Sequence, residues 1–145
     1  MRIQENVARL SLLWAAFPPV EDVSAFDPVE DALGIPLPAD YKFFLMWSNG
    51  GSTLEPLPHC RLYPLEQLLP RRADGQPQGV LEVGTDDSLG FALDLTRGRH
   101  SASYRIVSYP LGDRGREDLE DVALTFNGFI SSWFQDAELK RREGA

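Results

Sequence analysis

The stretch that decides the fold reads Glu30-Asp-Ala-Leu-Gly-Ile-Pro-Leu-Pro-Ala-Asp-Tyr-Lys-Phe-Phe-Leu-Met-Trp-Ser-Asn-Gly-Gly51. Leu33-Gly34 predicts the end of one helix and Pro38 the beginning of the next, because glycine accepts the left-handed conformation of helix ends and proline suits a first turn. Asn49-Gly50 ends the second helix in the same way as Gly34 ends the first. These residues are therefore expected to set the angle between two short helices.

Three helices are expected before Gly51. In the first, apolar residues recur at steps of 4, 3, 4 and 3, which places them on one helical face. They are Ile3, Val7, Leu10, Trp14 and Phe17. Pro18-Pro19 ends this helix. The second begins at Asp27-Pro28, with the aspartate as N-cap. The third runs from Pro38 to Ser48, and its inner face carries Tyr41, Phe44, Leu45 and Ser48.

From Cys60 the pattern changes to short apolar runs divided by turn residues, which is typical of strands. The runs are Cys60–Tyr63, Val80–Val83, Phe91–Leu95 and Tyr104–Tyr109. Phe91, Leu93 and Leu95 alternate with Ala92 and Asp94, which predicts a sheet buried on one face. The connections are too short for crossover helices, so antiparallel pairing is expected.

A closing helix is predicted after Asp121 as N-cap, with apolar residues at helical spacing and Lys140 to Arg142 near its end, where cations are favourable. The apolar residues are Val122, Phe126, Phe129, Ile130 and Trp133. Helices, a meander of strands and a closing helix indicate an α+β domain. We expect one domain over residues 1–139 and a short charged tail at 140–145.

Length and composition exclude several classes of protein. The chain has 145 residues, enough for one domain, and its 43% apolar and 25% charged residues are ordinary for a soluble globular protein. Fourteen basic and 22 acidic residues leave a net charge of −8, which disfavours nucleic-acid binding. No uninterrupted apolar run is long enough to span a membrane. The single cysteine, Cys60, fits a reducing compartment, so a cytoplasmic location is expected.

No pattern in the sequence predicts catalysis, a metal site or a cofactor. His59 and Cys60 are adjacent and His100 is distant, so they lack the spacing of zinc ligands. The serine-hydrolase and phosphate-binding glycine motifs are absent. The segment Gly84–Gly90 does not fit a calcium loop and is interpreted as a hairpin turn. These residues therefore disfavour an enzyme, which stays the least favoured hypothesis for this chain.

The stretch from Glu30 to Gly51 resembles the hallmark of the SUKH superfamily, the Smi/Knr-like proteins. The matching positions are Glu30, Leu33, Gly34, Leu37, Pro38, Asp40, Tyr41, Phe44, Asn49, Gly50 and Gly51. Later segments similar to the family are Arg61–Leu68, Gly84–Asp87, Phe91–Asp94 and Ala123–Phe126 with Phe129. The resemblance covers roughly Asp27 to Trp133. Ser88-Leu89 departs from it, because many relatives carry more glycine in that turn.

The resemblance implies an α+β domain without catalytic residues, in which N-terminal helices and a C-terminal helix pack on a mainly antiparallel sheet. Bacterial members are immunity proteins that bind and block a toxin, often a nuclease or deaminase, whereas fungal members resemble regulatory scaffolds. Our first hypothesis is therefore an immunity protein, acting as a monomer or weak dimer, for a toxin that is basic where it holds phosphate. The alternative is a regulatory or scaffold module with no toxin partner.

Two sets of residues are assigned roles. The set expected to determine the fold is Leu33, Gly34, Pro38, Tyr41, Asn49 and Gly50. The set expected to bind the partner lies in exposed acidic loops and is Glu55, Asp86, Asp87, Glu117 and Asp118. In addition, seven acidic residues and one lysine lie between Glu21 and Glu55. They form either a solvated face or a docking surface for a cationic partner.

Overall fold

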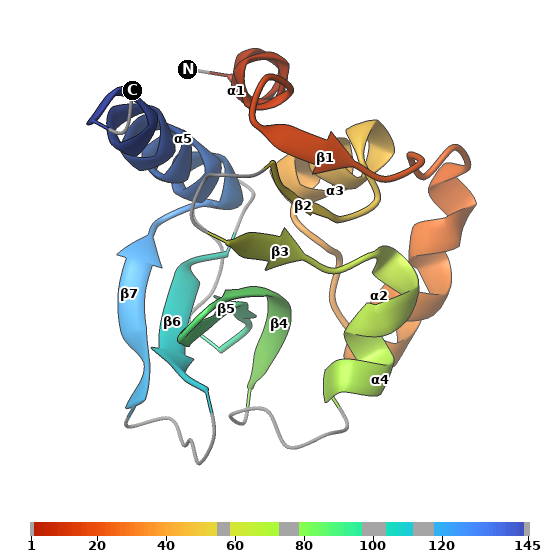
Figure 1. Cartoon of the computed structure of the whole chain (residues 1–145). Helices are drawn as coiled ribbons and strands as arrows, with labels where there is room; N and C mark the ends of the chain where they lie inside the picture. The colour runs from red at the N-terminus through yellow and green to blue at the C-terminus, as the bar shows by residue number, and fades with distance from the viewer. Residues whose placement is uncertain (1, 55–58, 73–78, 97–103, 112–117, 144–145) are drawn as a thin grey trace.

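The structure, a computed structural model, describes residues 2–54, 59–72, 79–96, 104–111 and 118–143 (Figure 1). Its α-helices are α1 (Ile3–Leu10), α2 (Asp27–Leu33), α3 (Ala39–Trp47), α4 (Leu68–Arg72) and α5 (Phe126–Glu143). Short 3₁₀ helices, η1 (Val23–Phe26) and η2 (Leu65–Gln67), precede α2 and α4. Its strands are β1 (Trp14–Ala16), β2 (Gly51–Thr53), β3 (Cys60–Leu62), β4 (Val80–Asp86), β5 (Leu89–Asp94), β6 (Ile106–Pro110) and β7 (Glu120–Ala123).

The described strands form one seven-stranded antiparallel sheet in chain order, with β1 and β7 at its edges. Helix α1 lies against α3 and α5 at the end of the molecule that also carries both termini (Figure 1). The predicted α+β class and antiparallel pairing are confirmed. None of the helices among the described residues is both long enough and apolar enough to cross a membrane.

Aromatic side chains from three elements meet in the core between the helices and the sheet. The ring of Tyr41 lies 4.9 Å from that of Phe126, and the ring of Phe44 lies 5.4 Å from it, measured between centroids. Trp14 of β1 packs edge-on against Phe44. Edge-to-face pairs of this kind add to the free energy gained from burial. The core therefore joins α3, α5 and the β1 edge of the sheet.

The first helix is shorter than predicted. It ends at Leu10, and Trp14 belongs to β1, whose residues pair with β2 in the register Trp14↔Thr53. As a strand residue, Trp14 keeps its buried position, and its indole N–H donates to the carbonyl of Gly50 at 3.3 Å. Phe17, expected on the buried face, is 36% exposed. Pairing with β2 outweighs the helical spacing, because tertiary contacts override local propensity.

The beginnings of two other helices also differ from the prediction. Asp121 lies in β7 opposite Val107 and does not cap α5. Instead Thr125 caps that helix, because its hydroxyl accepts the backbone N–H of Gly128 at 2.9 Å. Asp27 is the first residue of α2, because η1 leads directly into that helix.

Both faces of the central strands are buried, so the prediction of a one-sided sheet is wrong. Ala92 and Asp94, expected on the open face of β5, are buried. A second apolar cluster, which includes Ala92 and Tyr109, lies on this face. The Tyr109 ring lies over Gly90, where a Cβ atom would be 2.5 Å from the ring. At Gly90 this face is thus covered by a side chain of the neighbouring strand, which the alternation in β5 does not reveal.

Candidate partner-binding surface

The acidic residue that opens the hallmark holds the turn between α2 and α3. Glu30 Oε2 accepts the backbone N–H of Leu37 at 2.6 Å and pairs with Lys42 Nζ at 2.8 Å. Gly34 ends α2 with a φ of +74°, as expected. Pro38 then precedes α3 in an extended conformation, and its carbonyl accepts the N–H of Lys42. This part of the hallmark therefore fixes the connection between two helices.

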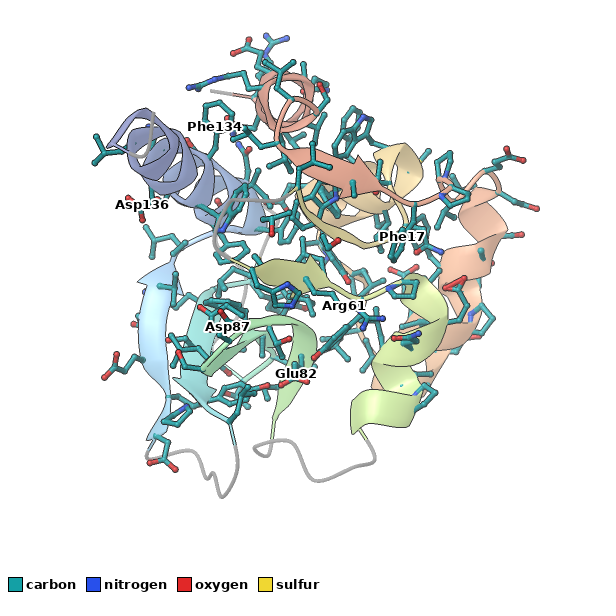
Figure 2. The ribbon with its side chains drawn as sticks, in the orientation of Figure 1. Phe17, Arg61, Glu82, Asp87, Phe134 and Asp136 are labelled. Carbon is teal, nitrogen blue, oxygen red and sulfur yellow. The ribbon has the colours of Figure 1, made fainter. Side chains whose placement is uncertain are left out.

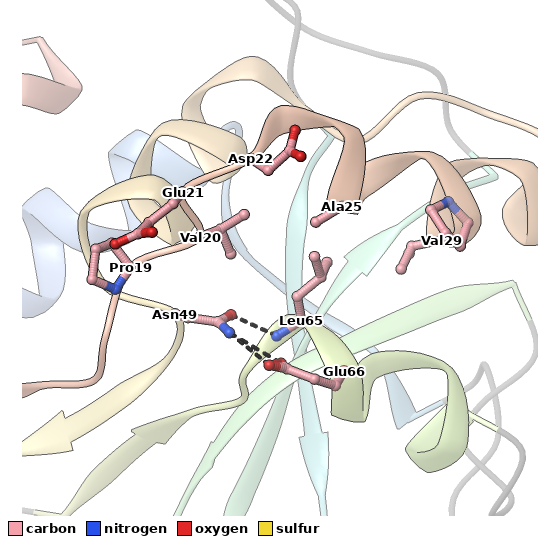
Figure 3. A pocket seen from close by; sticks show the side chains of 10 residues that line it. Pro19, Val20, Glu21, Asp22, Ala25, Val29, Asn49, Leu65 and Glu66 are labelled. Carbon is pink, nitrogen blue, oxygen red and sulfur yellow. Dashed lines mark hydrogen bonds between the residues drawn. The ribbon is translucent and has the colours of Figure 1, made fainter.

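The prediction that Asn49-Gly50 caps α3 is wrong, because the helix ends at Trp47 and Ser48 follows it in an extended conformation. Asn49 has instead a side-chain role that the sequence reasoning missed. Its Oδ1 accepts the backbone N–H of Leu65 at 2.7 Å, and its Nδ2 donates to both carboxylate oxygens of Glu66, at 2.9 and 3.0 Å (Figure 3). These bonds link the segment that follows α3 to η2. Nothing in the local sequence signals them, because their partners lie 16 and 17 positions away.

The next residue, Gly50, occupies a place that only glycine fits. Its φ is +87°, and a Cβ atom there would lie 2.7 Å from both the carbonyl oxygen of Leu62 and the nitrogen of Pro64. Backbone atoms cannot move aside as a flexible side chain can. The chain after α3 therefore runs against the end of β3, and this contact positions Asn49 beside η2.

A groove of about 410 Å³ lies beside Asn49, between η1, the beginning of α2 and η2 (Figure 3). Its apolar floor consists of the buried residues Val20, Val29 and Leu65. Its acidic rim consists of the exposed residues Glu21, Asp22 and Glu66. The groove thus combines an apolar surface with three carboxylates.

The rim carboxylates are not neutralised by a cation in the described part of the chain. No lysine, arginine or histidine is among the described residues that line the groove. Lys42, the lone lysine of the acidic N-terminal half, is paired with Glu30. Asp22 Oδ1 accepts the backbone N–H of Ser24 at 2.9 Å, and the hydrogen bonds from Ser24 lower the pKa of Asp22. The groove therefore carries net negative charge at neutral pH.

The predicted partner-binding residues lie away from this groove or outside the described residues. Asp86 is the last residue of β4, and Asp87, labelled in Figure 2, follows it in the turn to β5, as the hairpin prediction required. Asp86 pairs with Cys60 at the beginning of β3, whereas Glu66 follows the end of that strand, so the two acidic sites lie at opposite ends of β3. Glu55 and Glu117 lie outside the described residues.

Within the turn, the two aspartates differ in what they contact. Asp86 Oδ1 accepts the backbone N–H groups of Ser88 and Leu89 at 2.8 and 2.7 Å, so its carboxylate shapes the turn. Asp87 is exposed. Asp118, the remaining predicted residue, is half-buried just before β7. Within the turn, Asp87 thus presents its carboxylate to solvent, whereas that of Asp86 is used in backbone hydrogen bonds.

Two buried ionisable side chains, those of Cys60 and Glu82, make the contacts of structural residues. Burial, with a smaller contribution from Asp86, raises the pKa of the Cys60 thiol to about 12, so the reactive thiolate is not formed at neutral pH. The Glu82 carboxylate accepts the hydroxyls of Tyr63, at 3.1 Å, and Tyr109 inside the sheet. No group of three or more histidine, cysteine, aspartate or glutamate residues is placed to hold a metal within the described ranges.

Comparison with curated proteins finds no match. A family model does match: residues 22–132, about three quarters of the chain, fit the SMI1 / KNR4 family (SUKH-1). The matched segment contains both helices of the hallmark, most of the sheet and the beginning of α5, so it includes every described residue of the groove except Pro19, Val20 and Glu21. The chain belongs to the SMI1 / KNR4 family (SUKH-1).

Proposed function

We propose that this protein is a non-enzymatic immunity protein that binds a cognate toxin and covers its active site. The observation that carries the proposal is the groove beside Asn49, with its apolar floor and three carboxylates. Family membership supports a binding role, since bacterial relatives of this kind are expected to neutralise toxins. The chain needs no catalytic group for this, because occlusion of the toxin is sufficient.

Charge supports a basic toxin as the partner. A toxin that cleaves or modifies nucleic acid must carry lysine or arginine where it holds phosphate. This protein has a net charge of −8, so the two surfaces would attract each other before contact. Complementary charge speeds association and makes its rate fall with salt. Such speed suits an inhibitor that must act before the toxin reaches its substrate.

The test is neutralisation of a toxin-type protein encoded beside this chain. The toxin is expressed in bacteria alone, with this protein, and with an unrelated acidic protein of similar size as control. We expect growth to be restored by this protein but not by the control, and the purified pair to associate more slowly at high salt. A complex in which the toxin remains active would refute neutralisation. A tight complex with a neighbour that has no toxic activity would instead support the regulatory alternative.

A further inference from the structure

We propose that the groove beside Asn49 receives one arginine side chain of the partner protein. Its methylene stem would lie on the floor formed by Val20, Val29 and Leu65, and its guanidinium would meet the rim carboxylates. This inference rests on the proposed function, because it names the feature of the partner that the surface recognises. The proposed function requires only attraction between an acidic protein and a basic toxin. The inference adds one specific side-chain contact between them.

The floor favours a side chain with an apolar stem over a small hydrated cation. Val20, Val29 and Leu65 are each at most 9% exposed, yet they line an open groove of about 410 Å³. Long basic side chains bury their methylene groups on apolar surface while their charged ends stay near water. A bare metal ion or an ammonium ion would leave this apolar surface uncovered. The groove therefore favours a basic side chain that carries an apolar stem.

The rim favours arginine over lysine. Asn49 holds both oxygens of the Glu66 carboxylate, so this acceptor is already oriented before binding. Asp22 is held at one oxygen, Oδ1, which accepts the backbone N–H of Ser24. A guanidinium has several donors in one plane and can contact two carboxylates at once, whereas an ammonium is a compact, strongly hydrated charge. Fixed acceptors also reduce the conformational entropy lost on binding.

A second copy of this chain is a poor occupant. Each copy carries a net charge of −8, and contact through the groove would bring the rim carboxylates against another acidic surface. Like charges placed together oppose association. A basic partner supplies charge of the opposite sign to that of Glu21, Asp22 and Glu66.

The test uses the blocked peptide acetyl-Gly-Arg-Gly-amide, followed by NMR at low salt. Two peptides of similar shape serve as controls, one with citrulline, which has no charge, and one with lysine. We expect the arginine peptide to shift the methyl signals of Val20, Val29 and Leu65 and the side-chain amide of Asn49 in a saturable way. The lysine peptide should bind more weakly, and the citrulline peptide should leave these signals unchanged.

Two alanine variants separate filling of the groove from general effects. Ala25 lines the groove in η1, so A25L fills it without changing charge. Ala32 is exposed on α2 and does not line the groove, so A32L is the matched control. We expect A25L to weaken peptide binding at least about tenfold and A32L to leave it within about twofold. The charge variant E66Q should weaken it about threefold, as expected for one exposed ion pair.

The inference is overturned if the citrulline peptide shifts the groove signals equally, if A25L binds as the parent does, or if the largest shifts occur at Asp86 and Asp87. The same variants, tested in the toxin assay, distinguish this failure from failure of the proposed function. Full protection by A25L would refute the groove contact while leaving neutralisation intact. Peptide binding in the groove without protection by the parent would refute neutralisation while leaving the arginine site intact.

Discussion

The carboxylate of Asp40, in α3, accepts the backbone N–H of Asn127, in the first turn of α5, at 2.8 Å. The two residues are 87 positions apart in the chain. The side-chain carbonyl of the same Asn127 accepts the amide of Asn6, in α1, at 2.6 Å. The first N–H groups of a helix have no acceptor within the helix. The Asp40 carboxylate supplies an acceptor for one of these groups at the beginning of α5. Three helices are therefore joined by polar contacts at one place.

Replacing Asp40 should destabilise the protein. We expect D40A to lower the free energy of unfolding by about 1–2 kcal/mol, because an acceptor at the beginning of α5 is lost. Urea unfolding followed by circular dichroism measures the change. Asp31 is an exposed aspartate on α2, and D31A should change stability by about 0.5 kcal/mol or less. Equal effects of the two variants would show that the contact with Asn127 contributes nothing.

Gly34 and Gly50 allow backbone strain to be separated from steric overlap. Both have positive φ, but a Cβ atom at Gly34 meets nothing within 4 Å, whereas one at Gly50 meets the backbone of Leu62 and Pro64. We expect G34A to lower the free energy of unfolding by about 1–2 kcal/mol, because alanine is strained in the left-handed conformation. G50A should lower the free energy of unfolding by about 3 kcal/mol or more, because overlap of the new Cβ atom with the backbone adds to the conformational strain. Thermal and urea unfolding of both variants provide the comparison, and similar losses would contradict the predicted overlap.

Tyr41 should act through its ring and not its hydroxyl. The ring is 1% exposed, and its hydroxyl has no hydrogen-bond partner within the described structure. Y41F should therefore preserve stability or raise it by about 1 kcal/mol, since it removes a buried, unsatisfied polar group. Y41A should cost about 3–5 kcal/mol, because it leaves a large cavity beside Phe126. If Y41F melts like the parent yet loses toxin binding, Tyr41 belongs to a binding site.

The stability of the protein should fall with alkaline pH because of Cys60. The thiol has a reference pKa of 9.0, and burial raises the pKa in the folded state to about 12. Above pH 9 the unfolded chain therefore loses a proton that the folded chain keeps, so the free energy of unfolding decreases as pH rises. This contribution is fully present below pH 9 and is lost progressively toward pH 12.

Urea unfolding of the parent and of C60A at pH 8 and pH 10 tests this. Between pH 8 and pH 10 we expect the free energy of unfolding to fall by about 1 kcal/mol more in the parent than in C60A. The interval ends near the ordinary pKa of tyrosine, so Tyr41, whose pKa is also raised by burial, contributes little to it. A parallel decline in parent and variant would mean that Cys60 keeps an ordinary pKa in the folded protein.

The two turn aspartates should behave differently. D87K should change stability by about 0.5 kcal/mol or less, because Asp87 is exposed. D86K should cost about 1–2 kcal/mol, because Asp86 accepts two backbone N–H groups of the turn. D87K is therefore the suitable variant for binding kinetics. Slower association of D87K with a basic toxin at low salt would place this turn at the interface, and an unchanged rate would remove it.

Much of the hallmark could be predicted from sequence because its signals are local. Gly34 and Gly50 do adopt positive φ, and α3 does bury Tyr41, Phe44 and Leu45. Glycine conformations and helical spacing depend on neighbouring residues only. The hairpin between β4 and β5 was predictable for the same reason. The hydrogen bonds that fix these elements against one another were not.

The edge strands could not be predicted, because neither has a strand pattern of its own. β1 has three residues and continues a helical spacing, and β7 is mostly exposed and contains two carboxylates. Each becomes a strand because its neighbour in the sheet offers unpaired backbone groups. The groove beside Asn49 was missed for a related reason, since its walls come from three segments separated in the chain.

The sequence by itself determined the α+β class, the end of α2 at Gly34, the acidic charge and the family hallmark. Each of these depends on residue types and on spacings within one or two turns of the chain. Only the tertiary structure decided that Trp14 lies in a strand, that Asp40 supports α5, and that Asn49 orients Glu66 at the rim of an apolar groove. Those outcomes depend on which distant backbone groups and side chains meet, and that is set when the helices and the sheet pack together.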